Sequence, residues 1–323
     1  SSDDDDSADD DDSADDDDSA PALPDADGDG VPDSLDQCAD QDDLLDDNAN
    51  GVPDGCDWVQ VDATQFFVCG RVASGRVYCW GSNADGQTDV PAGPTDFFID
   101  VAAGSNHACG LRSDGSVACW GDSTGALGSP PAGPFSDLAA GEDFSCGLRS
   151  ADGLVECWGF SGFGVLTEPA EPYVSIEGGG DSACGIRANQ TVNCWGGNGL
   201  PLDDPSGTFT QISLGWGSSA VGLKADGTGA AWGLTDFQVQ ATFTVGQPYA
   251  HIAANFNNVC AVDSAENMQC WGSNNYGILT QTPGGLWSSV VVGTYFACGV
   301  GADATVACWG DDTFDQDVVP VPD

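Results

Sequence analysis

The sequence predicts an all-β protein: a seven-bladed β-propeller closed by its N- and C-terminal strands and preceded by an extended acidic, calcium-binding arm. A Trp-Gly pair recurs through most of the chain, each copy alternates short strand-like runs with Gly-rich turns, and no segment shows a capped helical periodicity. The pairs begin at Trp80, Trp120, Trp158, Trp195, Trp232, Trp271 and Trp309, with spacings of 40, 38, 37, 37, 39 and 38 residues. A unit of about 38 residues made only of strands and turns fits one propeller blade of four short strands.

The chain begins with a strongly acidic region, residues 1–57. This region holds 24 Asp and Glu residues and no Lys or Arg, in a chain of 323 residues with 52 acidic and 6 basic residues. Residues 1–24 are expected to form a low-complexity arm, because SSDDDDSADDDDSADDDDSA has no aromatic residue and no apolar face. Alone, such an arm is a solvated coil; divalent cations, glycans or a neighbouring subunit could each order it. No signal peptide opens the chain, so Ser1 is expected to begin a processed or truncated product.

Residues 25–57 carry the oxygen side chains of a predicted calcium segment. Acidic residues recur at alternate positions and Gly30 permits a tight turn, which suits a cation that takes about six to eight oxygen ligands. The first predicted site takes Asp25, Asp27, Asp29, Asp33 and Asp36. A second and weaker site, in which amides replace two carboxylates, takes Asp46, Asn48, Asn50 and Asp54. A disulfide between Cys38 and Cys56 would tie the two copies together.

The stretch from Asp25 to Cys38 resembles a thrombospondin type 3 repeat. It matches the pattern D-x-D-x-D-G-x-x-D-x-x-D-x-C at every position, and the resemblance implies Ca²⁺ as the bound ion. A merely acidic linker is the alternative interpretation. An EF-hand fits less well, because no apolar helical stripe flanks the segment and the loop position that needs glutamate is Asp36.

The propeller is expected to span residues 58–323. In each copy an aromatic residue opens a short run with apolar alternation, such as FIDVAAG or FSDLAAG, which predicts a half-buried strand. The opening residues are Trp58, Phe98, Phe135, Tyr173, Phe209, Tyr249 and Trp287. Two further strands are expected in a hairpin around an Asp-Gly or Asn turn, and a Gly/Pro-rich segment after Trp-Gly leads to the next copy.

The two ends of the repeat region predict how the ring closes. After Trp309 the chain has only a segment like GSNADGQTDVPAGP, which follows Trp80. At the other end, the repeat region starts at Trp58 with only the portion that comes next in the repeat. The termini are therefore expected to complete one shared blade, with Val59 and Val319 in the same sheet. Closure buries the strand edges that an open array exposes, which favours a ring over a solenoid.

The fourteen cysteines are expected to form disulfides. Six copies hold two cysteines that face each other across the predicted hairpin, whereas the fifth copy has Val221 and Ala231 there, so both cysteines are lost together. Zinc is the rival interpretation, but its cysteine ligands usually lie about two to four residues apart. The hairpin pairs are Cys69–Cys79, Cys109–Cys119, Cys146–Cys157, Cys184–Cys194, Cys260–Cys270 and Cys298–Cys308. Such pairing indicates an oxidising compartment and hence a secreted or cell-surface protein.

The motifs F-x-D-V-A-A-G, C-G-L-R-S-D-G-x-V-x-C-W-G and S-N-A-D-G-Q resemble the repeats of the regulator of chromosome condensation family. The resemblance covers residues 58–323 and implies a seven-bladed propeller, without fixing a function. Eukaryotic members act on a small GTPase and chromatin, which the acidic charge and the paired cysteines make doubtful here. Exported bacterial relatives include an inhibitor of β-lactamases, which implies that a propeller face can bind a protein.

Charge and composition exclude several classes of partner. A net charge of −46 repels the phosphates of nucleic acids and anionic lipid surfaces. No apolar run approaches the length of about 18 residues that a membrane helix needs. The two histidines, His107 and His251, occupy non-equivalent positions in different copies, and we expect no catalytic residues. Carboxylates are so numerous that pairs of them come close by chance, and their number neither supports nor excludes glycosidase chemistry.

Several surface residues have both a functional and a structural interpretation. Four cations, Arg112, Arg149, Arg187 and Lys224, occupy the same hairpin position in successive copies. They could receive an acidic arm from a neighbouring molecule or, as we favour, pair with carboxylates of their own or adjacent blades. The Trp-Gly tryptophans are expected to pack between blades, which leaves Trp216 as a candidate for an exposed contact. The candidate glycosylation sites are Ser7, Ser13, Ser19 and Asn189.

The sequence therefore predicts a non-enzymatic extracellular structural protein. In this hypothesis a calcium-binding propeller associates with copies of itself through the acidic arm, in a filament or surface layer, or attaches to another surface. The alternative is a cell-surface module that binds a protein or glycan on a propeller face, with the arm as a spacer.

Overall fold

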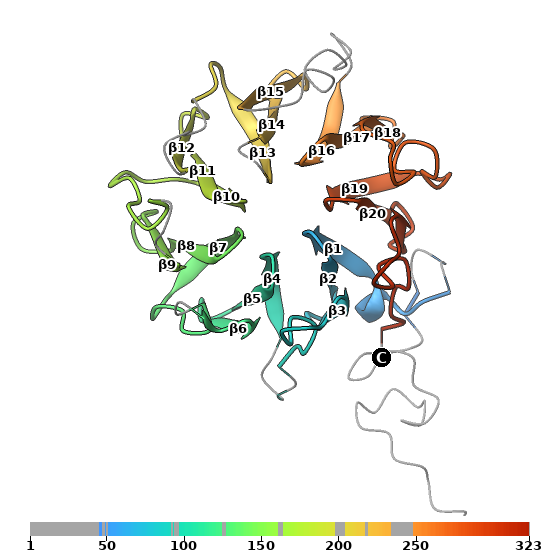
Figure 1. Cartoon of the computed structure of the whole chain (residues 1–323), viewed down its shortest axis with the longest axis horizontal. Coiled ribbons are helices and arrows are strands. Elements are labelled where there is room, and N and C mark those ends of the chain that lie inside the picture. Colours follow the sequence, from blue (N-terminus) through green and yellow to red (C-terminus); the bar gives the residue numbers. More distant parts are fainter. Residues whose placement is uncertain are drawn as a thin grey trace, which may run out of the picture.

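A computed structural model shows seven three-stranded antiparallel sheets arranged in a ring around a central channel (Figure 1). It describes residues 45, 46, 49, 51–91, 93, 97–124, 127–160, 164–197, 204–216, 219–233 and 248–322. Each sheet is one blade, and its first strand lies nearest the channel. The predicted seven-bladed propeller is confirmed.

The blades follow one another in chain order and have the same topology. A short 3₁₀ helix, η1 (Asp54–Cys56), precedes the first blade. The strands of blades one to seven are, in order, β1 (Trp58–Ala63), β2 (Phe67–Val72), β3 (Val77–Gly81); β4 (Phe98–Ala103), β5 (His107–Arg112), β6 (Val117–Gly121); β7 (Phe135–Ala140), β8 (Phe144–Arg149), β9 (Val155–Gly159); β10 (Ser175–Gly179), β11 (Ser182–Ile186), β12 (Val192–Gly196); β13 (Phe209–Gly215), β14 (Ser219–Lys224), β15 (Gly229–Gly233); β16 (Tyr249–Asn255), β17 (Asn258–Asp263), β18 (Met268–Gly272); and β19 (Trp287–Val292), β20 (Phe296–Gly301), β21 (Val306–Gly310).

Each described blade has three strands instead of the predicted four. The segment after Trp-Gly, where a fourth strand would lie, is turned by side-chain hydrogen bonds. In the first such segment the Thr88 backbone N–H donates to Asn83 Oδ1 at 3.0 Å, and in the second the Thr124 N–H donates to Asp122 Oδ1 at 2.8 Å. These side chains offer the backbone an alternative to strand pairing.

The core consists of seven apolar clusters, one between each pair of neighbouring blades. Within each blade the opening aromatic residue packs on the Trp of Trp-Gly, with ring centroids 5.6 to 6.1 Å apart. The glycine after the first hairpin cysteine makes room for this ring. A Cβ on Gly147 would lie 2.5 Å from Cδ1 of Phe135. The C-G pair of the repeat is therefore explained by close aromatic packing.

Five of the seven Trp-Gly tryptophans, Trp80, Trp120, Trp158, Trp195 and Trp309, also join neighbouring blades by hydrogen bonds. The indole N–H of Trp120 donates to the carbonyl of Gln87 at 3.0 Å, and that of Trp309 donates to the carbonyl of Ile278 at 3.0 Å. In each case the acceptor belongs to the segment that follows the preceding Trp-Gly. Six of the seven tryptophans are only 5–8% exposed and Trp271 is half-buried, which confirms that the series packs in the core.

The chain ends meet at blade one. There the indole N–H of Trp80 donates to the carbonyl of Gln316 at 2.9 Å, so the C-terminal segment takes the place that a preceding blade fills elsewhere. Val319 packs against the cluster that contains Trp58 and Trp80. The segment closes the ring as irregular chain, so the expected pairing of Val59 and Val319 in one sheet is not seen. Pro320 and Pro322 lack the N–H groups that a strand would need.

Six predicted disulfides lie in the blade hairpins, and their cysteines are directly opposite in register. The pairs are Cys69–Cys79, Cys109–Cys119, Cys146–Cys157, Cys184–Cys194, Cys260–Cys270 and Cys298–Cys308. In blade five Val221 and Ala231 face each other in the same register. Cys56 is buried, and its predicted partner Cys38 lies outside the described residues.

Replacement of Gly147 by alanine tests the packing of the opening aromatic ring. Because the new Cβ overlaps Phe135, we expect Gly147→Ala to lower the free energy of unfolding by about 1–3 kcal/mol. Gly284→Ala is the matched control, since no atom lies within 4 Å of its Cβ position, and it should change stability by less than about 0.5 kcal/mol. Urea unfolding measures both variants, and equal midpoints would contradict the packing argument.

Candidate functional site: the channel and the distal face

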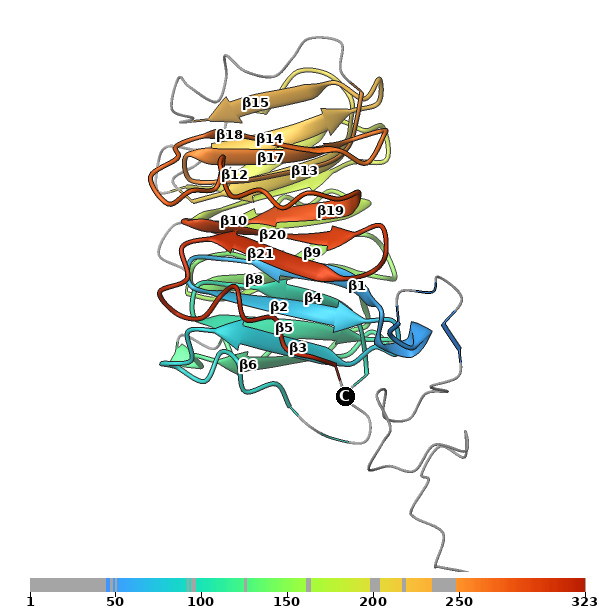
Figure 2. The ribbon, with the colours of Figure 1, turned by 90° about the vertical axis from the view of Figure 1, so that its right-hand side faces the viewer.

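The propeller has two faces with different components. On one face, the arm face, residues 51–57 contact the turn between β2 and β3, where the N–H groups of Ala73 and Ser74 donate to the carbonyls of Asp57 and Gly55 at 2.8 Å (Figure 2). The opposite face, the distal face, carries the turns between the first and second strands of each blade. The segments that follow Trp-Gly begin there, since the Ser82 N–H donates to the Phe66 carbonyl at 2.9 Å.

A cavity of about 460 Å³ occupies the centre of the ring and is lined by the innermost strands. Side chains along such a strand alternate between the two neighbouring blades. In β4, Val101 and Ala103 pack toward blade one, whereas Ala102 packs toward blade three. Two equivalent positions in each innermost strand point toward the next blade at the rim of the channel. The position nearer the arm face holds Gln60, Asp100, Asp137, Ser175, Gln211, His251 and Ser289, and the position nearer the distal face holds Asp62, Ala102, Ala139, Glu177, Ser213, Ala253 and Val291.

Polar side chains at these positions bind the backbone of the next innermost strand. Asp62 Oδ2 accepts from the Ala103 N–H at 2.8 Å, and Asp137 Oδ2 accepts from the Ile176 N–H at 2.9 Å. Gln211 accepts from the Ile252 N–H at 3.1 Å and donates to the Ile252 carbonyl at 3.2 Å. These bonds satisfy backbone groups on strand edges that face the channel. The channel polar residues therefore have a structural role between blades.

Four of these residues are carboxylates on consecutive blades. Burial and then the charge of Asp100 raise the pKa of Asp62 to about 6 and that of Asp137 to about 7. Burial also raises the pKa of Asp100. Burial, followed by the charges of Asp62, Asp137 and Asp100, raises the pKa of Glu177 well above its ordinary value. No Lys or Arg is among the described residues that line the cavity. Arg71 lies behind one side of it, where its Nε donates to Gln60 Oε1 at 3.2 Å and its charge lowers the pKa of Asp100 in part.

The two histidines have different surroundings. His107 is fully buried, and its Nε2 lies 2.8 Å from Ser145 Oγ. His251 lines the channel, where its Nε2 is 3.0 Å from Gln211 Nε2 and its Nδ1 faces the Val290 N–H at 3.4 Å. Burial lowers the pKa of each histidine to about 4. Both are therefore neutral near pH 7 and serve as structural groups.

One side of the distal face is acidic. Glu142 and Asp143 form the turn between β7 and β8, and Asp181 forms the corresponding turn of blade four. Burial, and then the charges of Asp181 and Asp143, raise the pKa of Glu142 to about 7. Burial and the charge of Asp122 raise the pKa of Asp143. We call this set, Asp122, Glu142, Asp143 and Asp181, the acidic arc.

The other side of the distal face carries aromatic side chains on blades six, seven and one. Phe66 and Phe314 pack edge to face with centroids 5.4 Å apart, and Tyr276 and Tyr295 lie 4.4 Å apart. Phe256 lies in the turn of blade six. The exposed fractions of Phe256, Tyr276 and Phe314 are 46%, 44% and 41%. We call this set, Phe66, Phe256, Tyr276, Tyr295 and Phe314, the aromatic arc.

The arm residues predicted to bind calcium lie mostly outside the described part of the chain. Asp46 and Asp54 are described, and Asp46 Oδ2 accepts a hydrogen bond from the Gly51 N–H at 3.0 Å. The others are Asp25, Asp27, Asp29, Asp33, Asp36, Asn48 and Asn50. Within the described residues, no three His, Cys, Asp or Glu side chains are grouped so that they could hold a metal ion.

The candidate glycosylation residue Asn189 is exposed in the β11–β12 hairpin turn, whereas Ser7, Ser13 and Ser19 lie outside the described residues. Both the N–H and the hydroxyl of Thr191 donate to Asn189 Oδ1, at 3.1 and 2.7 Å. Asp226 and Thr228 make the same turn in blade five, at 3.0 and 2.6 Å. The sequon thus also has a structural explanation, and its modification stays a prediction.

Three of the four hairpin cations find partners in their own repeats. Arg149 forms an ion pair with Asp152, and Arg187 binds Glu171 at 2.7 Å. Arg112 stacks its guanidinium 5.3 Å from the ring centre of Phe98. These contacts support pairing within blades over a shared docking arc. Trp216, the candidate exposed contact, is half-buried and lines the distal end of the cavity.

Fold and site together define a class of protein: a disulfide-bonded seven-bladed propeller with an acidic channel and one face of unlike loops. Residues 58–87 and 98–124 match the model of the regulator of chromosome condensation (RCC1) repeat, so the chain contains repeats of this type. No curated protein shows significant sequence similarity to the chain. No described helix has the length and hydropathy needed to cross a membrane.

Solved structures of several propellers are similar to the chain. The ectodomain of the Physcomitrella patens receptor kinase CR4 is 24% identical, with a TM-score of 0.66 and coverage of 79% of this chain and 74% of that chain. The CRINKLY WD40 ectodomain of the Arabidopsis thaliana receptor kinase ACR4 is 28% identical, with a TM-score of 0.57 and coverage of 67% and 80%. Human WBSCR16 is 15% identical, with a TM-score of 0.59 and coverage of 73% and 84%.

The channel carboxylates predict an unusual dependence of stability on pH. The pKa of Asp137 is about 7 in the folded protein and 3.8 ordinarily, so the folded state binds more protons between these values and stability falls as pH rises from about 4 to 7. Asp137→Asn keeps an oxygen acceptor for the Ile176 N–H and removes the charge. At pH 8 we expect the substitution to raise the melting temperature, by about 2–4 °C for each kcal/mol added to the free energy of unfolding. At pH 5 Asp137 is protonated in the folded protein, so the change should be smaller.

Thermal unfolding between pH 5 and pH 8 measures this effect. Asp152→Asn is the control, because Asp152 is exposed and its pKa is lowered by its hydrogen bond with Arg149. If Asp137→Asn lowers the melting temperature at pH 8, the unfavourable charge assigned to this site is wrong.

Proposed function

We propose that the protein is an extracellular protein-binding module that holds its partner on the distal face. The observation that carries the proposal is the aromatic arc, in which the loops of the sixth and seventh repeats expose three large rings on one face. Aromatic side chains are enriched at the centres of protein interfaces because they bury much area at low entropic cost. Six disulfides keep the loops that present these rings on a rigid scaffold.

The surroundings of the aromatic arc favour a protein with basic residues as the partner. The acidic arc lies on blades two to four of the same face, across the channel from the rings. A partner that covers both arcs needs apolar groups on one side and cations on the other. The net charge of −46 disfavours nucleic acids and anionic lipids. The similar propellers of two receptor kinases are ectodomains, which supports an extracellular setting for this one.

The described end of the N-terminal region, residues 51–57, lies on the face opposite the proposed binding surface. It is fixed to the arm face by backbone hydrogen bonds from Ala73 and Ser74. In the proposed function the acidic arm is a spacer on the side away from the partner, which corresponds to the binding-module hypothesis.

Substitutions on the two faces test the proposed function. The variant Phe256→Ser, Tyr276→Ser, Phe314→Ser removes the exposed rings, and we expect it to weaken binding to a purified partner at least tenfold. The control variant is Ile99→Ser, Val174→Ser, Leu286→Ser, which removes side chains that are 51%, 59% and 54% exposed at the arm face. It should leave affinity unchanged.

The partner is first identified by crosslinking in the extracellular fraction and then purified for titration calorimetry. A binding partner that is lost with both variants, or retained with both, contradicts the proposed role of the distal face.

A second candidate function is assembly through a calcium-stiffened arm. The anchored root of the arm favours it: the Asp54 N–H donates to the Leu45 carbonyl at 2.7 Å, and η1 joins this turn directly to β1. An arm fixed at its base can transmit order from bound ions to the propeller. In this function Ca²⁺ binds the carboxylates of residues 25–36, and the ordered arm contacts a neighbouring copy.

Light scattering tests the assembly function. Millimolar Ca²⁺ should raise the molar mass of the full chain, and EDTA should reverse the change. Asp27→Asn with Asp29→Asn should abolish this response, whereas Asp152→Asn on the propeller should not. A chain that stays monomeric with and without Ca²⁺ removes the assembly function and leaves the distal-face proposal intact.

A further inference from the structure

The innermost strands arrange polar groups in three successive layers from the distal mouth of the channel inward. Asn255 and Trp216 lie at the mouth, Asp62 and Glu177 lie two residues deeper along their strands, and the level of Asp137 is deeper again. Successive layers are separated by two residues of a strand, a rise of about 6.7 Å. A group that enters the channel from the distal face therefore meets side-chain hydrogen-bond acceptors at increasing depths.

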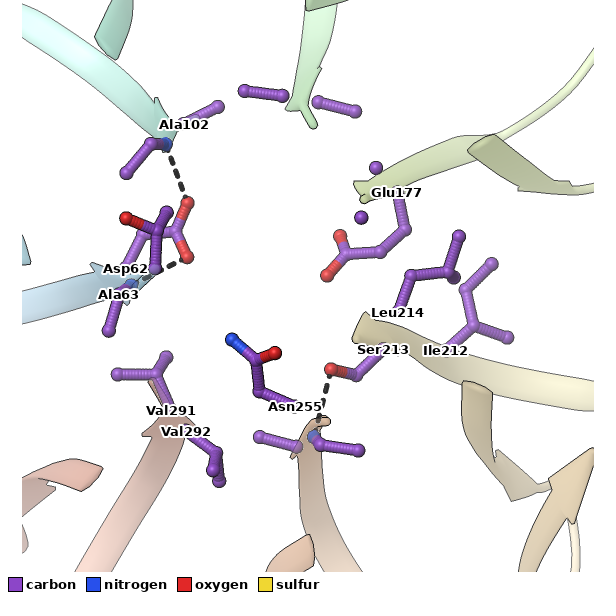
Figure 3. Close-up of a pocket in the computed structure, with 18 of the residues that line it drawn as sticks. Asp62, Ala63, Ala102, Glu177, Ile212, Ser213, Leu214, Asn255, Val291 and Val292 are labelled. Atoms are coloured by element: carbon purple, nitrogen blue, oxygen red, sulfur yellow. Dashed lines mark hydrogen bonds between the residues drawn. The ribbon is translucent and has the colours of Figure 1, made fainter. Parts of the chain in front are cut away.

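Asn255 provides an observation that is independent of the acidic residues. Its side chain is only 6% exposed, and its Oδ1 accepts from the Trp216 N–H at 3.1 Å. The amide group points into the cavity (Figure 3), and within the described residues its Nδ2 has no recorded hydrogen-bond partner. The Nδ2 group is therefore a hydrogen-bond donor at the mouth of the channel. A ligand carbonyl at the mouth would satisfy it.

Glu177 is the channel carboxylate best placed to meet a ligand. The two carboxylate oxygens of Asp62 accept hydrogen bonds from the N–H groups of Ala63 and Ala103, both at 2.8 Å. For the Glu177 carboxylate no hydrogen bond is recorded within the described part of the chain, and Figure 3 shows it on the wall opposite Asp62, directed into the cavity. The titratable side chains lining the described cavity are Asp62, Asp100, Asp137, Glu177 and His251. None of them carries a fixed positive charge that could balance Glu177.

We infer that the channel receives a lysine or arginine side chain of the protein partner, inserted through the distal mouth. The cation would lie between Glu177 and Asp62, in the layer that also holds Val291 and Ala253, and its backbone carbonyl would lie near Asn255 Nδ2. The separation of the first two layers matches the length of a lysine side chain. This inference rests on the proposed function, because it names the chemistry of the partner that the distal face binds.

Inorganic cations fit the site less well. Across the part of the chain with assigned positions, no three acidic or histidine side chains converge closely enough to hold a metal ion. A metal would also need several oxygens at once, and those of Asp62 and Asp137 are already bonded to backbone N–H groups. An elongated organic cation needs only one or two carboxylates and can fill the length of the cavity.

Small probes test the inference without the partner. N-acetyl-lysine methylamide is titrated into the full chain at pH 7 by calorimetry and NMR, with the norleucine analogue as an uncharged control of similar shape. We expect millimolar or tighter binding of the lysine probe and at least tenfold weaker binding of the norleucine probe. Because the cation favours ionised carboxylates, binding should release protons, which titrations in buffers of different ionisation enthalpy measure.

Two matched variants locate the binding. Glu177→Gln should weaken the lysine probe at least tenfold, and it should fold well because glutamine has nearly the same shape and can remain uncharged in the buried site. Glu142→Gln changes the acidic arc outside the channel and should alter affinity less than twofold. Equal binding of the two probes, no effect of Glu177→Gln, or displacement of the lysine probe by stoichiometric Ca²⁺ would each overturn the inference. The distal-face proposal would still stand if the aromatic variant loses the partner.

Discussion

The structure depends on contacts between blades, because a single blade leaves apolar side chains and hydrogen-bonding groups without partners. The Trp of each Trp-Gly packs on the aromatic residue that opens its own blade, but its indole N–H needs a carbonyl from the segment that follows the preceding blade, as Trp120 finds in Gln87. The apolar clusters likewise lie between blades. In an open array the first indole would have no preceding segment, and here Gln316 supplies the acceptor for Trp80.

The same dependence explains why the channel is acidic. The innermost strands of neighbouring blades do not pair with each other, so side chains must bridge their edges. Asp62 and Asp137 accept from backbone N–H groups across the gap, where an aspartate oxygen is a strong acceptor. Each such bond places a charge next to the channel, and the charges repel one another. Bridging between blades therefore accounts for Asp62 and Asp137 in the channel wall, whereas no such bridge from Glu177 is seen among the described residues.

The repeat period, the aromatic residue that opens each blade and the six cysteine pairs were predictable, because each depends on residues spaced regularly within one copy. The joint loss at Val221 and Ala231 revealed the hairpin register before any coordinates. The channel was not predictable, although the Asp in FIDVAAG and FSDLAAG is plain to see. Sequence does not tell toward which neighbouring blade a strand residue points. The prediction of a C-terminal strand was wrong. The segment after Trp309 is similar to the segments of other copies, but Pro320 and Pro322 at its end lack the N–H groups that strand pairing needs.

The loops of the distal face can differ in side chains from blade to blade, because the hydrogen bond that they share uses only a backbone carbonyl. The residue just before each second strand accepts, through its carbonyl, a bond from the N–H that follows Trp-Gly, at 2.8 to 3.1 Å in the six blades where both groups are described. The six residues are Phe66, Asn106, Asp143, Asp181, Asn257 and Tyr295. Because a carbonyl is common to every amino acid, the side chain at this position can vary without loss of the bond. A fold built from equal copies thus acquires an aromatic side and an acidic side on one face, and a partner that distinguishes the two can bind in only one orientation around the ring.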